Sequence, residues 1–395
     1  MKARILVSMA LALVHTHIAA AQAVVTRTRV SDGKGYDERP LITPLANGTY
    51  AVVWDRTTGD VPISLQGRVV RQDGTMATPV KKGVLGPPLN QYTSFSTSAL
   101  GGTDRIVISG TRSSDTQIVT RVYDSKLAAK SPLRASGQTG YDSHLAMAAS
   151  GAVLAWNGPD GAVIAPVGTT GFVGDTRLGI DSTSTSTFLQ PTRVGLAPGG
   201  YCVAGVETKS DYSTSRPATI YVPADLSAPG TLSPLRSAFG TGTFSPDAAF
   251  LEDAGYALFG LTTSDTASSG YIRKLKTDGR PTGGAKKFPV SSAGFTAYYR
   301  ILPLTGTDRY AVAWYNFGDG LMYLQLRSDK GTALADPVRI SDNSYSIDDA
   351  LVDLAYDAAT SRLLVVYSEF PAIPITHQDV MLAVFDVSAA TARIR

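Results

Sequence analysis

Few side chains in this chain can exchange protons near neutral pH. Its 395 residues include four histidines and one cysteine. His15 and His17 belong to an N-terminal segment described below, which leaves His144 and His377 as candidates for acid or base catalysis. Two histidines and one cysteine exclude a Cys-based zinc site and an intramolecular disulfide. A bound metal would have to be an oxygen-ligated Ca²⁺, and the sequence carries no Ca²⁺ loop motif, so we expect no cofactor.

Arginine and tyrosine side chains accompany His144 in a repeated pattern. Tyr298 and Tyr299 directly precede Arg300, and Arg193 lies in another copy of the sequence repeat that is described below. β-Elimination on a uronic-acid glycan needs such a set: a cation for the charge that develops beside the carboxylate, a base near neutral pKa, and an acid for the leaving oxygen. We predict His144 as the base, Arg193 and Arg300 as carboxylate binders, and Tyr298 or Tyr299 as the acid. The predicted substrate-binding set is completed by Asp247, Tyr141 and His377.

Other roles for these residues stay open. His144 could be a structural histidine held by a hydrogen bond, and Arg300 could form an ion pair with Asp247 between neighbouring repeats. A glycosidase would instead use two carboxylates at a defined separation. Four acidic residues could supply such a pair: Asp142, Asp247, Asp348 and Asp349.

The elements that must position these residues recur seven times. A short apolar, β-rich segment occupies residues 50–54, 106–110, 152–156, 201–205, 256–260, 310–314 and 363–367, and we take its last residue as an anchor. The anchors are 46 to 56 residues apart. Such a period is typical of repeat folds such as solenoids and propellers. It is too short for a chain of β-sandwiches, which need about 100 residues each.

Each repeat contains the pattern of four antiparallel strands. A strand that ends in a Gly-rich turn precedes the anchor segment, and an alternating strand that ends in a polar turn follows it, as in residues 271–279. A short fourth strand comes next, as in residues 337–341. Seven such units predict an all-β, seven-bladed β-propeller. Residues 25–32 match the fourth-strand pattern and stand before the first full unit, so we predict that this N-terminal strand closes the ring; residues 392–395 could compete for that place.

First strands lie nearest the axis of a propeller, so their early residues border its channel. We align them on the apolar residue before the turn. Three positions earlier stand Ile42, Thr97, His144, Arg193, Ala248, Ile301 and Leu351, and four earlier stand Leu41, Ser96, Ser143, Thr192, Asp247, Arg300 and Ala350. This alignment predicts His144 beside Arg193, and Asp247 beside Arg300, on neighbouring blades. Trp54, Trp156, Trp314 and Cys202 lie in second strands and are expected in the core between blades.

The links between blades also share a feature, an aromatic residue near the end. These residues are Tyr36, Tyr92, Tyr141, Phe188, Phe244, Phe295 and Tyr345. They could pack one blade on the next, or some of their rings could line a pocket in which sugars stack. His377 lies on the long link between the second and third strands of the seventh blade. We expect that link on the same face of the propeller as the links between blades.

In plan the chain resembles the broad superfamily of secreted seven-bladed propellers, and more distantly the propeller polysaccharide lyases. The resemblance covers nearly the whole chain after residue 23 and implies the architecture, since fold does not imply function. The Ser-x-Asp-x-Gly-x-x-Trp box of sialidases and the signatures of kelch and WD40 repeats are absent.

Residues 1–23 have the layout of a secretory signal peptide. A basic start, an apolar run from residue 5 to 14 and small residues at 19–23 follow one another. The run is shorter than the roughly 20 residues of a membrane span, so the alternative of an N-terminal anchor is disfavoured. We therefore expect residues 24–395 to form one secreted propeller, extracellular or, in a Gram-negative source, periplasmic. Without residues 1–23 the formal net charge falls to about +1, which gives no reason to expect nucleic acid as a partner.

Two functions of different kinds follow from these residues. The first is a secreted polysaccharide lyase that cleaves a uronic-acid-containing glycan by β-elimination. The alternative is a non-catalytic, lectin-like propeller, and a protein-interaction scaffold is a third hypothesis without a specific sign in the sequence. In the first two cases the partner is an extracellular polysaccharide or glycan, bound by a monomer without a membrane span.

Overall fold

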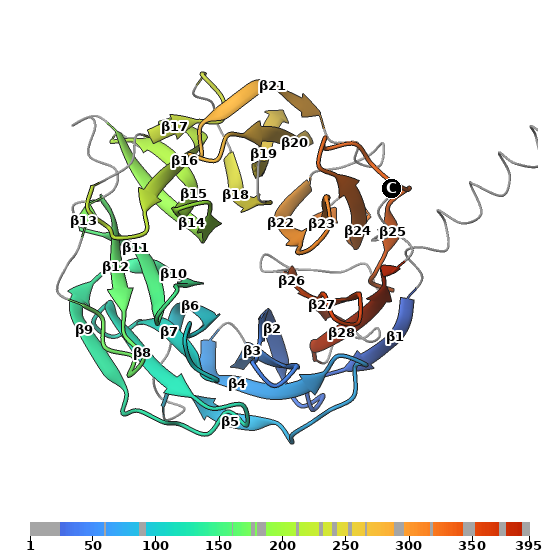
Figure 1. The fold of residues 1–395 in the computed structure, drawn as a ribbon. Coiled ribbons are helices and arrows are strands. Elements are labelled where there is room, and N and C mark those ends of the chain that lie inside the picture. The colour runs from blue at the N-terminus through green and yellow to red at the C-terminus, as the bar shows by residue number, and fades with distance from the viewer. Residues whose placement is uncertain are drawn as a thin grey trace, which may run out of the picture.

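The computed structural model describes residues 24–388, apart from the segments 59–60, 87–91, 160, 175–177, 180–186, 211–212, 229–231, 239–242, 252–254, 265–266, 288–295, 317–318, 343–351 and 371–376. Its 28 strands form seven four-stranded sheets. All strand pairs within the sheets are antiparallel. The sheets stand around a central channel as the blades of a propeller (Figure 1), so the predicted fold class is confirmed.

Each blade runs outward from the channel in the order of its strands, except the last. The inner strands are β2 (Tyr36–Pro44), β6 (Tyr92–Ala99), β10 (Tyr141–Met147), β14 (Thr187–Ala197), β18 (Thr243–Phe250), β22 (Thr296–Leu304) and β26 (Val352–Asp357). The second strands are β3 (Thr49–Thr58), β7 (Ile106–Arg112), β11 (Ala152–Gly158), β15 (Gly200–Lys209), β19 (Gly255–Ser264), β23 (Arg309–Asn316) and β27 (Arg362–Glu369).

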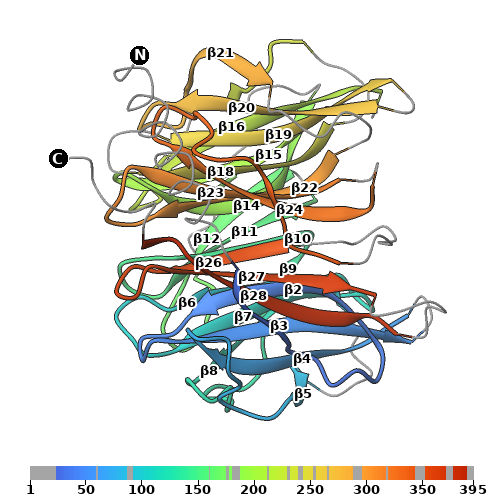
Figure 2. The same cartoon turned by 90° about the vertical axis from the view of Figure 1, so that its right-hand side faces the viewer.

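In each blade the outermost strand is shorter than the third strand. The third strands are β4 (Val61–Arg71), β8 (Gln117–Tyr123), β12 (Gly161–Val167), β16 (Ser215–Pro223), β20 (Ala267–Leu275), β24 (Leu321–Ser328) and β28 (Asp379–Asp386). The outermost strands are β5 (Lys81–Val84), β9 (Arg134–Thr139), β13 (Leu178–Gly179), β17 (Leu232–Pro234), β21 (Pro281–Lys287), β25 (Val338–Arg339) and β1 (Val24–Arg29). In the side view of Figure 2 the strands run between the two faces of the disc. We call the face at which inner strands begin the upper face, and the other the lower face.

The N-terminal strand β1 is the outermost strand of the seventh blade. It pairs antiparallel with β28, with Arg27 opposite Ala383. The Arg27 guanidinium forms ion pairs with Asp342 and Glu369, and its Nε donates a hydrogen bond to the Tyr367 hydroxyl at 2.6 Å. The ring is therefore closed by the strand that the sequence predicted, while the competing residues 392–395, like the predicted signal peptide at 1–23, lie outside the described residues.

Apolar side chains fill the space between neighbouring blades. Seven clusters of buried residues make up this core, and several of them combine two blades, such as Leu145 of the third blade with Val107 of the second. Trp54, Trp156 and Trp314 are at most 1% exposed, and Cys202 is buried with them, as predicted. The described part of the chain has no helix long and apolar enough to cross a membrane.

Inner strands carry a β-bulge shortly after they begin. In β10 the pairing moves from Tyr141–Asn157 to His144–Ala155, so two residues face the single residue Trp156. Similar shifts occur in the inner strands of the first six blades. A bulge rotates the residues around it and re-aims the side chains that follow. The bulges therefore decide which residues reach the channel.

Candidate functional site in the central channel

Four charged or titratable residues occupy the same level of the channel. His144, Arg193, Arg300 and Asp353 each lie opposite the residue that precedes the anchor in the neighbouring second strand. Leu41 and Ser96 hold this position in the first and second blades. The structure thus brings Arg300 to the level of His144 and Arg193, a pairing that the sequence alignment had missed.

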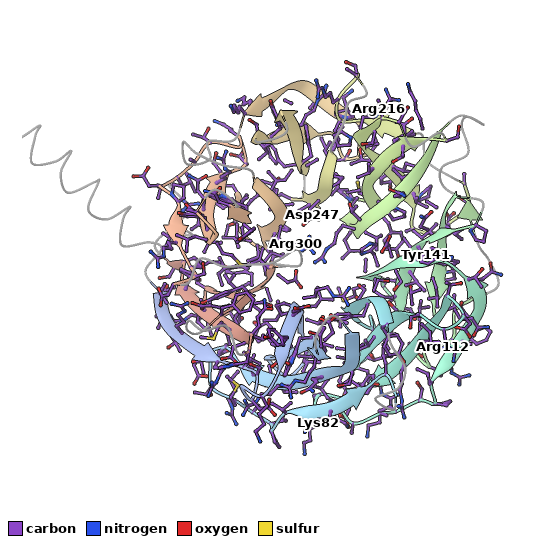
Figure 3. The ribbon with its side chains drawn as sticks, turned by 180° about the vertical axis from the view of Figure 1, so that it is seen from behind. Lys82, Arg112, Tyr141, Arg216, Asp247 and Arg300 are labelled. Carbon is purple, nitrogen blue, oxygen red and sulfur yellow. The ribbon has the colours of Figure 1, made fainter. Side chains whose placement is uncertain are left out.

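Asp247 lies one residue further along its strand than this level. The bulge in β18 comes one position later, so Asp247 pairs with Leu258, two residues before the anchor. The expectation that Asp247 and Arg300 hold equivalent positions was therefore wrong by one residue. Figure 3 nevertheless shows both side chains beside the central opening.

An ion pair crosses the channel from the fourth blade to the seventh. The Arg193 guanidinium donates a hydrogen bond to Asp353 Oδ1 at 2.9 Å, and Arg300 Nε lies 3.7 Å from the same oxygen. Arg193 keeps 29% of its side chain accessible inside the channel, whereas those of Arg300 and Asp353 are 10% and 6% exposed. Burial lowers the pKa of Arg193, but the carboxylates of Asp353 and Asp247 outweigh it and raise that pKa. Both guanidiniums thus face acidic partners in a nearly dry space.

His144 is a neutral imidazole in this surrounding. Burial, followed by the charges of Arg193 and Arg300, lowers its pKa to about 3. Its Nε2 lies 3.2 Å from the Pro191 carbonyl oxygen of the next blade. A carbonyl can only accept, so Nε2 carries the hydrogen and Nδ1 of the neutral ring keeps its lone pair. The His144 imidazole is therefore hydrogen-bonded, as expected for a structural histidine, but its Nδ1 can still take a proton.

The two buried carboxylates also connect blades through the backbone. Asp247 Oδ2 accepts the Ile301 N–H at 3.1 Å, and Asp353 Oδ2 accepts the Ile42 N–H at 3.0 Å. Burial raises the pKa of Asp247, although Arg193 and Arg300 oppose the shift. A direct ion pair between Arg300 and Asp247 does not occur among the described contacts, which couple Arg300 to Asp353 instead. These aspartates therefore both hold the ring together and balance the arginines.

Similar polar contacts connect other neighbouring inner strands. Ser96 Oγ accepts the Leu145 N–H at 2.9 Å, and Thr192 donates its hydroxyl to the Pro246 carbonyl at 2.6 Å. The side chains that make these two contacts, Ser96 in the second blade and Thr192 in the fourth, carry hydroxyl groups and no charge. Leu41 and Ser96 at the channel level of the first two blades are uncharged, so the charged residues of the channel come from the fourth to seventh blades.

The remaining predicted residues lie toward the upper face. Tyr298 and Tyr299 occupy the bulge of β22, between Ala297 and Arg300, and their side chains are outside the described part. Tyr141 begins β10 with 51% of its surface exposed (Figure 3). His377 precedes the Gln378 that bridges to Tyr36, and its Nε2 is 3.6 Å from Asp379. Tyr141, Tyr298 and Tyr299 thus come before the channel level in their inner strands, toward the upper face, and His377 lies on the link between β27 and β28 at the same face.

The inter-blade aromatic residues do not share one environment. Tyr92 is buried and donates its hydroxyl to the Leu85 carbonyl at 2.8 Å, which is a packing role, whereas Tyr141 is exposed. The side chains of Phe188 and Phe244, and the residues Phe295 and Tyr345, lie outside the described part. Asp348 and Asp349 lie outside it as well.

Asp353 is the site residue that sequence reasoning did not find. The alignment placed Leu351 and Ala350 at the channel of the seventh blade, because it counted back from Leu354 without a shift in register. The pairing of Asp353 with Val366, one residue before the anchor Tyr367, is the signal that identifies it. That register could have been found by counting from the anchor of the neighbouring strand.

The described residues contain no cluster for a metal ion, and one cleft lies away from the channel. No group of three or more His, Cys, Asp and Glu side chains in this part of the chain is arranged to hold a metal. A mainly apolar cleft of about 470 Å³ opens on the lower face between the third and fourth blades. Ala148, Leu196 and Tyr201 are among its lining residues, and it contains none of the predicted site residues.

Comparison with solved structures supports the architecture. The chain is similar to a protein of unknown function from Dyadobacter fermentans, with 12% identity over 93% of this chain and 99% of that chain and a TM-score of 0.56. It is also similar to the polysaccharide lyase Uly1 (8% identity, 92% and 99% covered, TM-score 0.56) and to the endosialidase of phage phi92 (9% identity, 92% and 69% covered, TM-score 0.52). Identities this low show a shared propeller fold alone. No protein-family model and no curated protein matches the sequence.

Proposed function

We propose that this chain is a secreted, glycan-acting propeller that binds a uronic-acid residue in its channel and cleaves the glycan there by β-elimination. The observation that carries the proposal is the gathering of His144, Arg193 and Arg300 at one level of the channel. Two guanidiniums at that level suit a carboxylate, because paired N–H donors bind its two oxygens. The two solved propellers named for a polysaccharide lyase and an endosialidase are in keeping with a glycan as the partner.

In the proposed reaction the substrate carboxylate binds to the two arginines beside Asp353. The proton on the carbon beside the carboxylate moves to Nδ1 of His144, and the electron pair of that C–H bond forms a carbon–carbon double bond. The bond from the next carbon to the glycosidic oxygen breaks, and the leaving oxygen takes a proton from Tyr298 or Tyr299. The arginines stabilise the negative charge that develops on the carboxylate as the first proton leaves.

The depressed pKa of His144 is part of this scheme. After burial, the positive charges of Arg193 and Arg300 are what hold it near 3. A second anion beside the two guanidiniums offsets their effect and raises the pKa of His144 toward the range of an effective base. The substrate itself would thus activate the imidazole.

A second function, binding without cleavage, is favoured by the same pKa. An imidazole with a pKa of about 3 is a weak base at neutral pH. If the glycan does not change that value, the channel binds a uronate without abstracting its proton. This is the lectin-like alternative.

The two functions are distinguished by incubating the protein with a panel of uronate polysaccharides and recording the ultraviolet absorbance of the unsaturated product. The lyase predicts a rising signal with at least one polymer, which His144→Ala abolishes while glycan binding remains. Arg193→Ala is expected to weaken binding, whereas Arg280→Ala, which removes an exposed arginine paired with Asp278, leaves it unchanged. Binding without absorbance supports the lectin, and a panel that is neither bound nor cleaved refutes both.

Export is a separate part of the proposal. It rests on the layout of residues 1–23, and N-terminal sequencing of the protein from culture medium or periplasm tests it. A mature chain that starts at residue 22 or 24 is the expected result, and an intact Met1 in the exported fraction would contradict it.

A further inference from the structure

Two inner strands share a strained residue at the upper mouth of the channel. Arg39 in β2 has a φ of 48° and Asp142 in β10 a φ of 51°. Each is the first of two bulge residues that face a single tryptophan, Trp54 in one blade and Trp156 in the other. Non-glycine residues rarely adopt this left-handed conformation, and those that do are concentrated at ligand sites, where the surrounding structure holds them.

Asp142 presents a carboxyl group without a protein partner. Asp142 is exposed at the upper face, and no hydrogen-bond donor or cation among the described residues contacts its carboxylate oxygens. Nearby strands still remove enough water to raise its pKa, and the charge of Arg39 acts in the opposite direction. Its oxygens are therefore open to donors from a ligand.

Arg39 is fixed beside Asp142 by contacts with the first two blades. Its Nε donates a hydrogen bond to Asp55 Oδ2 at 2.9 Å, and its guanidinium lies 5.7 Å from the centre of the Phe95 ring. The Ser143 N–H reaches Ser94 Oγ at 3.3 Å, which ties the bulge of β10 to the residue next to Phe95. One arginine thus stands between two carboxylates, those of Asp55 and Asp142. Among the described residues, the charge of Arg39 is therefore already opposed by these two carboxylates.

Tyr141 adds an exposed ring directly before Asp142. Its ring is half exposed, at the first residue of β10. Gly140 precedes it, and a Cβ at that position would lie 2.4 Å from Trp156 Cδ1 and 2.6 Å from the Asn157 carbonyl oxygen. A larger residue would push the strand away from Trp156, so the glycine lets the start of β10 pack against β11 directly before Tyr141. An exposed aromatic ring beside an open carboxylate suits the apolar face and the hydroxyl groups of a sugar.

We propose that Tyr141 and Asp142 form a subsite for a neutral sugar, adjacent to the uronate position. The inference rests on the proposed function, and it adds that the glycan is a mixed polymer in which a neutral, hydroxyl-bearing sugar neighbours the uronate. Tyr141 and His144 pair with Asn157 and Ala155, which are two residues or about 7 Å apart along β11, so one polysaccharide chain reaches both positions. Arg193 and Arg300 select the acidic sugar, while Asp142 repels a second carboxylate and accepts hydroxyl groups.

Affinity measurements with defined polymers test the subsite. The probes are deacylated gellan, in which neutral sugars neighbour each glucuronate, the homopolymers polymannuronate and polygalacturonate, and a neutral arabinoxylan. The wild type is expected to bind gellan about tenfold more tightly than either homopolymer. Tyr141→Ala and Asp142→Asn should each weaken gellan binding about tenfold. Tyr141→Ala should change homopolymer binding less than twofold, whereas Asp142→Asn should strengthen it, because the repulsion of the second carboxylate is lost. Asn also adopts positive φ, so the second variant removes the charge without removing the bulge.

Matched controls lie on the lower face. Phe172→Ala removes a ring that is 50% exposed, and Asp225→Asn an exposed carboxylate; both should leave all affinities unchanged. Asp142→Gly gives a second readout, because relief of the strain should raise the thermal midpoint while gellan binding falls.

The outcomes separate the subsite from the proposed function. Equal affinity for gellan and the homopolymers, or Tyr141 and Asp142 variants that bind like the wild type, overturns the subsite alone. If no uronate polymer binds but arabinoxylan does, and the two variants abolish that binding, the proposed function fails and the subsite stands. If no polymer binds, both are overturned.

Discussion

The protonation of His144 leads to a quantitative prediction for stability. Its pKa is lowered from 6.5 to about 3 in the folded protein. Above pH 6.5 the ring is neutral in both the folded and the unfolded chain and contributes no pH dependence. Below pH 6.5 the unfolded chain binds a proton that the folded protein refuses, so the folded state loses about 1.4 kcal/mol per pH unit until the pH reaches about 3. At pH 4 the accumulated loss is about 3 kcal/mol.

The perturbation that reveals this loss is His144→Gln. Glutamine retains an N–H that can donate to the Pro191 carbonyl but does not titrate. For a chain of this size, an unfolding entropy of about 2.1 cal/mol/K per residue converts 3 kcal/mol into a shift of about 4 °C in thermal midpoint. The difference in midpoint between variant and wild type should therefore move by about 4 °C in favour of the variant between pH 7 and pH 4.

The assay is thermal unfolding at half-unit steps of pH, followed by circular dichroism, with Tyr141→Phe as the control whose difference from wild type stays flat. A constant offset between His144→Gln and wild type at every pH would refute the reasoning. So would a difference that grows in favour of the wild type on acidification, because the ring would then be charged in the folded protein.

Two further substitutions test the ion pairs that join distant blades. Asp353→Asn keeps an acceptor for the Ile42 N–H but leaves the Arg193 and Arg300 guanidiniums without their shared carboxylate, so we expect a loss of about 2–3 kcal/mol, less than for a fully dry pair because Arg193 is partly accessible. Thermal unfolding measures it against Asp115→Asn, whose exposed pair with Arg112 should matter little, and equal midpoints would contradict the role given to Asp353. Arg27→Ala removes the ion pairs that hold β1 and should accelerate amide exchange in that strand at least tenfold, whereas Arg29→Ala, which loses one 3.4 Å contact at a half-exposed site, should have a smaller effect; equal rates in the two variants would count against the closure contacts.

The architecture could be predicted because each blade repeats the same local physics. The anchor segments form buried second strands such as 152–156 and 310–314, where each blade must fill the same space against its neighbours. The closing strand was also predictable, because its alternating pattern matched a strand that every other blade already had. The periodic sequence pattern is therefore sufficient to predict the fold.

The site could be predicted only in part because it depends on bulges. A bulge adds a residue without changing the periodic pattern, so counting along one strand cannot reveal it. Asp247 was misplaced by one residue for this reason. Asp353 was missed for a different reason, because the alignment ended the inner strand at Leu354, whereas β26 continues to Asp357 without a shift in register. Residues 35–37 and 140–142 both read Gly-Tyr-Asp, yet their aspartates differ: Asp37 is fully buried and bound by Trp54 and Arg56, whereas Asp142 lies in the bulge itself.

The pairing of β1 with β28 has a consequence for the order in which the molecule is assembled. On the ribosome the first strand emerges more than 340 residues before its partners Tyr367 and Glu369. Until then its hydrogen-bonding edge, and that of β28 once made, are open to other chains. We expect the last blade to form only after β28 has been synthesised, and until then two nascent molecules could exchange their first strands.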